Sequence, residues 1–172
     1  MSCLAGDLPT FEAIWTFTKT QLLLRDDGLA AWKWNPDQTP HVTDINNATD
    51  GDILIAYALA RAAERWHRKD FREAATAIVE SLAKHVVIRH GGHRLLLPAV
   101  AGFTAKDRSD GPVVNLSYWI FEAFPVFAKL DPDDGWNNIG RDGQILLANA
   151  QFSPREFAAG LVVAARCAGA RP

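Results

Sequence analysis

The chain has 172 residues, of which 48% are hydrophobic and 22% are charged, and its formal net charge at pH 7 is −2. A chain of this size can bury a sizeable core, and its composition is typical of one globular domain. The charge excludes a basic surface that would attract nucleic acid or an anionic membrane. No segment approaches the ~20 apolar residues of a membrane-spanning helix, and the N-terminal residues lack the features of a signal peptide.

Hydrophobic residues recur every three or four positions along most of the chain, which predicts helices. In chain order, we expect them over residues 8–24, 51–66, 70–88, 116–129, 136–149 and 154–166. Pro125 is expected to kink or divide the fourth helix. Between the first two helices, Trp32 and Trp34 alternate as on a short strand. The Gly and Pro residues after position 88 predict a turn, a short strand and a loop. The prediction is one all-α domain with substantial loops.

The second predicted helix is apolar on two faces. Ile53, Ala56 and Ala60 fall on one face, and Ile55 and Leu59 fall on another. Such a helix is packed on both sides, and its alanines allow neighbouring helices to approach closely. We therefore expect it to be an inner helix of a layered α-structure.

Asp50 and Asp52 stand at the start of this helix and allow two interpretations. In the first, Thr49 or Asp50 is the N-cap and Asp52 lies in the first turn, where the helix dipole favours negative charge. In the second, one carboxylate lies at the open end of a buried helix and faces a cleft. The polar segment "DINNAT" just before Asp50 favours this second interpretation. Side chains two apart point in nearly opposite directions, so the two acids are not expected to share one role.

Aromatic residues are frequent in the predicted loops and near helix ends. Trp32, Trp34, Tyr118, Trp119 and Trp136 are the candidates. Their flat faces could stack on sugar rings, since aromatic rings pack through dispersion on other apolar surfaces. For any one of them, a place in the core is the more ordinary explanation.

The remaining candidates for chemistry are few. Cys3 and Cys167 are expected to be free thiols, with a disulfide between them as the alternative. His90 and His93 in "HGGH" lack further ligands at metal-binding spacing. There is no phosphate-binding loop, nucleophile elbow or zinc-protease helix. We expect no metal and no cofactor.

Several segments together resemble glycoside hydrolase family 8, the endoglucanases that include the cellulase accompanying bacterial cellulose synthases. The segment "NNATDGDILIAYALARAAERW" is similar to the family signature. "GDLPTFEAIWTFTKTQLLLRDDGLAAWKWNP", "LLLPAVAGF" and "PVVNLSYWIFEAF" come in the family's order. The resemblance covers roughly residues 4–150.

The resemblance implies an (α/α)6 barrel whose inner helices point their N-termini at a cleft for β-1,4-glucan. Asp50 corresponds to an active-site carboxylate. The family signature describes it as the nucleophile, whereas inverting mechanisms have it support the distorted sugar and its developing charge. Trp32 resembles a tryptophan that stacks on a glucose ring, and Tyr118 resembles a tyrosine near the scissile bond. Asp52 is expected to belong to the same substrate-binding site, where it would support the residues that touch the glucan.

Two parts of the family pattern have no counterpart here. An inverting glycosidase needs a general acid and a general base ~6.5–9.5 Å apart. The family's acid, a Glu upstream, and its base, an Asp downstream, both fall outside the resemblance. We therefore predict a partial catalytic domain over residues 1–152, about half of the barrel, with a divergent tail over 153–172. Alone, it is expected to show little or no cellulase activity.

Two other functions stay open on the sequence. The chain could be a non-catalytic glucan-binding or structural module of a cellulose-synthesis apparatus, or an α/α-barrel enzyme for another polysaccharide. The expected partners are a β-1,4-glucan and possible cellulose synthase machinery, with no nucleic acid and no membrane insertion. Family members are usually periplasmic or secreted, but this N-terminus shows no export signal.

Overall fold

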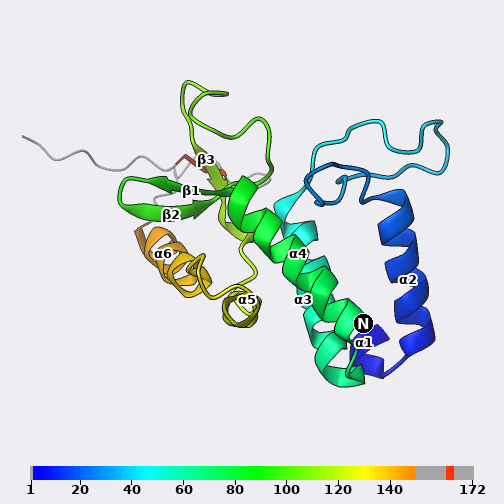
Figure 1. Cartoon of the computed structure of the whole chain (residues 1–172). Coiled ribbons are helices and arrows are strands. Elements are labelled where there is room, and N and C mark those ends of the chain that lie inside the picture. Colours follow the sequence, from blue (N-terminus) through cyan, green and yellow to red (C-terminus); the bar gives the residue numbers. More distant parts are fainter. Residues whose placement is uncertain (1, 150–161, 165–172) are drawn as a thin grey trace, which may run out of the picture.

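Two long antiparallel helices form the centre of the molecule (Figure 1). The structure is a computed structural model that describes residues 2–149 and 162–164. Helix α3 spans Thr49–Trp66 and helix α4 spans Lys69–His85. His67 ends α3 in the left-handed conformation, at φ 53°. The chain then turns back directly into α4, so the predicted inner helix is paired along its length.

The α3–α4 interface explains the alanine-rich sequence of α3. Ala56 and Ala60 of α3 are buried, as are Phe71, Ala75 and Leu82 of α4. Small side chains on one helix leave room for larger ones on the other. The expectation that α3 is packed on more than one side is confirmed, since Ile53, Leu59 and Ala62 are also buried.

Helix α2 (Leu8–Gln21) follows the short α1 (Ser2–Ala5) and runs beside the central pair (Figure 1). The Asp7 carboxylate accepts a hydrogen bond from the Thr10 amide at 3.1 Å and so caps α2. Phe11 contacts the rings of Trp66 and Phe71, with centroids 5.4 and 5.2 Å apart. Long aromatic side chains thus attach α2 to the α3–α4 pair.

Residues 22–48, here called the connector, contain no strand. The alternation of Trp32 and Trp34 predicted one, and that prediction is wrong. The Trp32 amide donates to the Asn46 carbonyl at 2.9 Å, but no ladder of such bonds follows. Trp34 instead packs against Phe17 and His41. The Trp32 ring therefore points outward and the Trp34 ring packs against α2, although the segment that carries them pairs with no strand.

A hairpin of β1 (Val87–His90) and β2 (His93–Leu96) follows α4. Its turn is formed by Gly91 and Gly92, both at positive φ (57° and 84°), as a two-residue hairpin turn requires. A second pair joins β3 (Val113–Asn115) to β4 (Val162–Ala164), also antiparallel. Strand β4 corrects part of the helix predicted over 154–166; the rest of that range lies outside the described residues.

The helix predicted over 116–129 is also wrong in its first half. The structure has a 3₁₀ turn, η1 (Leu116–Tyr118), and a separate helix α5 (Phe124–Leu130). The Asn115 side chain accepts from the Ser117 amide at 3.1 Å, which favours a single tight turn. Pro125 lies in the first turn of α5, where its missing N–H costs nothing. Of the two predicted effects, a kink and a division, the structure shows the division: the proline lies at the start of a new helix and does not kink a continuous one.

The final described helix, α6 (Trp136–Asn149), begins and ends where the sequence predicted. It packs with α5 and against the hairpin around buried aromatic rings (Figure 1). The molecule is thus helix-rich, with four short strands in its described part. None of the described helices combines the length and the apolar character needed to span a bilayer.

Candidate active site

The N-terminal end of α3 lies beneath the connector and beside the loop after β2. The Thr49 amide donates to the Pro98 carbonyl at 2.9 Å, and the Thr49 hydroxyl donates to the Leu97 carbonyl at 2.7 Å. The N-cap is Ala48, without a side-chain bond, so neither Thr49 nor Asp50 has the predicted capping role. Thr49 instead attaches the helix to residues 97–101, here called the 97–101 loop.

Asp50 is half-buried in the first turn of α3. One carboxylate oxygen accepts a hydrogen bond from the amide of the next residue, Gly51, at 2.9 Å. Within the described residues, the carboxylate bonds to no other segment of the chain. A Cβ added at Gly51 would meet no atom within 4 Å. Asp50 thus presents its carboxylate at the positive end of a helix, next to the open space at Gly51.

Asp52 has a different environment two residues later. It is only 1% exposed, and its two oxygens accept from the Ala30 amide at 2.7 Å and from Asn47 Nδ2 at 3.0 Å. Burial raises the pKa of Asp52 to about 6, although these hydrogen bonds from Ala30 and Asn47 act to lower it. A carboxylate so enclosed holds protein segments together and offers no surface to a sugar.

Trp32 is the exposed aromatic residue of the connector, at 52% exposure. Its indole Nε1 donates to Asp44 Oδ2 at 2.8 Å, and its amide is bonded to Asn46. The Lys33 ammonium lies 5.6 Å from the ring centroid. The ring is therefore fixed in orientation while much of its surface remains open to solvent.

Tyr118 lies in η1, half-buried against the hydrophobic core. In the described part of the chain, no hydrogen bond joins it to the start of α3. Trp119 and Trp136 are buried, at 3% and 0% exposure, so the core interpretation holds for them. The exposure of the rings separates Trp32 from these other candidates.

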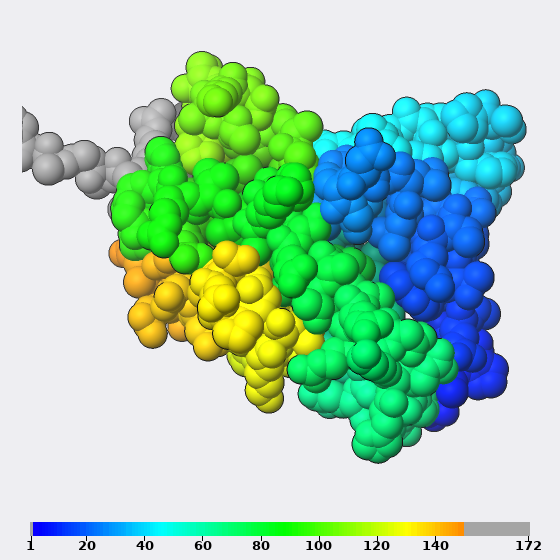
Figure 2. All heavy atoms as spheres, in the orientation of Figure 1, coloured from blue at the N-terminus to red at the C-terminus, as the bar shows by residue number. Residues whose placement is uncertain are grey.

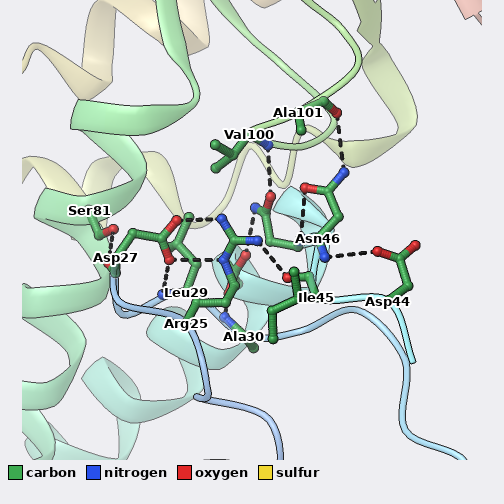
Figure 3. A network of polar contacts seen from close by, with 12 residues as sticks. Arg25, Asp27, Leu29, Ala30, Asp44, Ile45, Asn46, Ser81, Val100 and Ala101 are labelled. Atoms are coloured by element: carbon green, nitrogen blue, oxygen red, sulfur yellow. Dashed lines mark hydrogen bonds and ion pairs between the residues drawn. The ribbon is translucent and has the colours of Figure 1, made fainter. Parts of the chain in front are cut away.

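A polar network links the connector to the central helices, and the sequence did not single it out (Figure 3). Arg25 pairs with Asp27 and donates to the Ile45 carbonyl, and the Ser81 hydroxyl of α4 donates to the Asp27 carbonyl. Although burial opposes it, the hydrogen bond from Arg25 helps to hold the pKa of Asp27 below its usual value. Arg25 and Asp27 belong to "RDDG", directly after the first predicted helix, and no local pattern marked them as functional.

Asn47 is a further buried residue that the sequence did not single out. It is 3% exposed and bonds to Asp52 and to the Val100 amide. The only signal for it was the polar composition of "DINNAT". A buried amide between two loops depends on tertiary contacts that no local pattern shows.

No metal site is formed by the described residues, which contain no group of three or more His, Cys, Asp or Glu side chains placed to hold an ion. His90 and His93 face each other across the hairpin, and His93 Nδ1 lies 3.1 Å from Asp142 Oδ1. Cys3 lies on α1, and Cys167 is outside the described residues, so the state of the two thiols stays a prediction.

Comparison with known proteins decides the family. A sequence model described as Glycosyl hydrolases family 8 matches residues 1–169. The chain belongs to this family. The match runs past residue 152, and the division predicted there, with a divergent tail after it, stays a prediction.

The curated relatives of this family 8 chain are endoglucanases by name. It is 40% identical over 142 residues to the endoglucanase of Cellulomonas uda, covering 83% of this chain and 39% of that protein. It is 36% identical over 148 residues to the probable endoglucanase of Novacetimonas hansenii, covering 86% and 42%. The chain spans about two fifths of the length of these relatives.

Solved structures agree on the family 8 fold. An endoglucanase of Klebsiella pneumoniae, described as a family 8 glycosyl hydrolase, matches with a TM-score of 0.83 at 36% identity, over 89% of this chain and 48% of that one. An endo-β-1,4-glucanase of Acetobacter xylinum matches with the same TM-score at 34% identity, over 89% and 47%. The predicted half of an (α/α)6 barrel is confirmed.

Proposed function

We propose that the chain forms one part of an endo-β-1,4-glucanase active site, at the N-terminal end of α3. The observation that carries the proposal is the contrast between Asp50 and its neighbours there. Asp52 is enclosed, and Asp44 accepts from Trp32 and Asn46. Asp50 is the carboxylate of this region that bonds to no other described segment and adjoins open space.

Trp32 supplies the binding half of the proposed site. An indole face stacks on the apolar face of a sugar ring, and a ring already fixed by a hydrogen bond loses little freedom on binding. Trp32 has that fixed orientation through Asp44. We propose that a glucose unit of the glucan stacks on Trp32. Tyr118 is proposed to contact the glucan nearer the bond to be cleaved.

Asp50 supplies the charge in the proposed site. Hydrolysis with inversion needs an acid and a base on opposite faces of the sugar, with an oxocarbenium-like transition state between them. A carboxylate at a helix N-terminus can stabilise that positive charge and orient the sugar or water. The relatives are more than twice as long as this chain, and we propose that proton transfer is carried out by groups from the remaining part of their barrel.

The test separates glucan binding from hydrolysis. Electrophoresis in gels containing carboxymethylcellulose is expected to retard the purified chain, and Trp32→Ala is expected to abolish the retardation. Trp136→Phe, which changes a buried ring, is the matched control. Reducing-sugar release by the chain alone is expected to be little or none. Robust turnover that Asp50→Asn abolishes would contradict the division of the site, and no retardation would contradict glucan binding.

A second function is favoured by one observation, the exposed Trp32 ring, which its hydrogen bond to Asp44 already holds in place. Stacking without an acid and base could serve a non-catalytic glucan-binding module of a cellulose-synthesis apparatus. This function would be favoured if the chain is retarded in the gel, while proteins that join it to the remaining part of a family 8 barrel release no reducing sugar.

A further inference from the structure

Asn47 is the buried junction of three segments. Its Nδ2 donates to Asp52 Oδ2 of α3 at 3.0 Å, and its Oδ1 accepts from the Val100 amide of the 97–101 loop at 2.7 Å. Its own amide donates to Asn46 Oδ1 at 3.1 Å, within the connector. One side chain therefore ties the connector, the inner helix and a neighbouring loop together.

The direction of each hydrogen bond fixes how the Asn47 amide must lie. The Val100 amide can only donate, so Asn47 must present its oxygen there. Its nitrogen then faces Asp52, which must accept, and the other Asp52 oxygen accepts from the Ala30 amide. The Ala30 amide and the Asn47 amide nitrogen both donate to Asp52, so the buried carboxylate satisfies two donors that would otherwise lack this acceptor.

From Asn47 the contacts lead to Trp32 through Asn46. The Asn46 carbonyl accepts from the Trp32 amide at 2.9 Å, and the Asn46 amide donates to Asp44 Oδ1 at 2.9 Å. Asp44 in turn accepts from the Trp32 indole. Asn46 Nδ2 also donates to the Ala101 carbonyl at 3.2 Å (Figure 3). The backbone of Trp32 is thus held by Asn46, next to Asn47, and its ring is held by Asp44, which Asn46 also contacts.

The same junction lies next to Asp50. Thr49, the residue before Asp50, bonds to Leu97 and Pro98 at the start of the loop that Asn47 also holds. Resting on the proposed function, we infer that Asn47 is a positioning residue of the glucan site. It fixes the connector that carries Trp32 against the N-terminal end of α3, and so sets the stacking ring relative to Asp50.

Two variants test this role. Asn47→Asp removes the Nδ2 donor and puts a second carboxylate against Asp52. The double variant Asn47→Asp with Asp52→Asn restores the pairing in reverse, because the new amide at 52 can donate to the new carboxylate at 47. That carboxylate still accepts from Val100, and the amide oxygen at 52 still accepts from Ala30. Asn137→Asp, on the exposed side of α6, is the matched control.

The main readout is the solvent accessibility of the Trp32 ring, which changes if the connector no longer holds the ring in place, and it is measured without any ligand. Acrylamide quenching of tryptophan fluorescence is compared between each protein and the same protein carrying Trp32→Phe, which isolates the Trp32 signal. Titration with cellohexaose then gives the affinity. We expect Asn47→Asp to change Trp32 quenching and to weaken cellohexaose binding by about tenfold or more. The double variant is expected to restore both, and the control to change neither.

The outcomes distinguish this inference from the proposed function. If Asn47→Asp lowers only the melting temperature, with Trp32 quenching and affinity unchanged, or if a folded double variant restores neither, the positioning role is overturned. If Asn47→Asp does not fold, restoration of quenching and affinity in the double variant still supports it. If quenching responds as expected but no protein binds cellohexaose, the positioning of Trp32 stands and the proposed glucan function fails.

Discussion

Two tryptophan–aspartate pairs in this molecule have the same hydrogen bond and opposite surroundings. In the connector, Trp32 donates to Asp44 at 2.8 Å, and the ring is about half exposed. At the start of α6, Trp136 donates to Asp131 at 3.1 Å, and the ring is fully buried. The bond itself therefore marks neither binding nor stability. What surrounds the ring determines whether its fixed orientation serves a ligand or the core.

The packing around Trp136 shows the difference. Its ring stacks on Phe124 with centroids 6.0 Å apart and meets the edge of Phe127 at 5.1 Å. Within the described residues, no aromatic ring packs against Trp32, and the Lys33 ammonium is the charged group that lies over its ring. Figure 2 shows the surface of the connector, in blue and cyan, at the same end of the molecule as the segment after β2. The Trp32 ring is thus open to solvent, whereas the Trp136 ring is enclosed by other aromatic side chains.

Truncation of the two rings should give the largest difference between the regions. Trp136→Ala leaves a large cavity in the core and is expected to lower the free energy of unfolding by about 3–5 kcal/mol. Trp32→Ala removes an exposed ring and should change it by about 0.5 kcal/mol or less. Urea denaturation measures both. Equal losses would show that Trp32 is a core residue.

Asp52 sharpens the comparison, because it is a buried carboxylate on the connector side. Its folded pKa of about 6 lies above the ordinary 3.8, so the folded protein holds this proton more tightly between about pH 4 and 6. The stabilising contribution is present below pH 4 and is lost as pH rises through 6. The loss amounts to about 3 kcal/mol.

The variant Asp52→Asn isolates that contribution from the other titrating groups. Relative to Asp52→Asn, the wild-type chain should lose stability by this amount between pH 4 and pH 7 in urea denaturation. A constant difference across the range would mean that Asp52 is not enclosed as described.

Two glycines test the packing of the same two regions. A Cβ at Gly143 of α6 would lie 2.2 Å from the Trp119 ring, whereas one at Gly51 meets nothing within 4 Å. Gly143→Ala is therefore expected to cost about 1–3 kcal/mol from overpacking. Gly51→Ala should be neutral, or stabilising by up to about 1 kcal/mol because alanine favours helix. Thermal melts of the pair check this; a larger loss at Gly51 would show that the space beside Asp50 is filled.

The last comparison concerns the two carboxylates that accept the indole hydrogen bonds. Asp131→Ala leaves the buried Trp136 indole N–H without a partner, at a cost of about 1–3 kcal/mol. Asp44→Ala leaves the Trp32 N–H to water and should alter the stability by about 0.5 kcal/mol or less. The comparison is contradicted if chemical denaturation finds Asp44 to be the more important of the two.

The long helices could be predicted from the sequence because their periodicity is local. Helices α3 and α6 begin and end within two residues of the predicted bounds, and the alanines of α3 predicted its burial. The helix over 116–129 was wrong, because Asn115 and Pro125 impose a turn and a new start that periodicity does not report. Trp32 and Trp34 suggested a strand, but a strand needs a partner, and the connector has none within the described residues.

The candidate site was only partly predictable. Asp50 and Trp32 were candidates from their positions in the sequence, but only the family resemblance selected them, since no local pattern distinguishes Trp32 from Trp136. The enclosure of Asp52 could not be predicted, because its partners include Ala30, which is 22 residues away. The role of Asn47 depends on Val100, 53 residues away. Contacts over such distances are set by the assembled fold, so they become visible only in the structure.

The central claim is that Asp50 is the charged group of a family 8 glucanase site, and one measurement tests it directly. The matched segment of the Cellulomonas uda endoglucanase is replaced by this chain, and reducing-sugar release from carboxymethylcellulose is measured. The chimaera is expected to be active, and Asp50→Asn to lower its rate on the order of 100-fold, while Asp37→Asn, an exposed aspartate of the connector, leaves it unchanged. An active chimaera that is indifferent to Asp50→Asn would contradict the account.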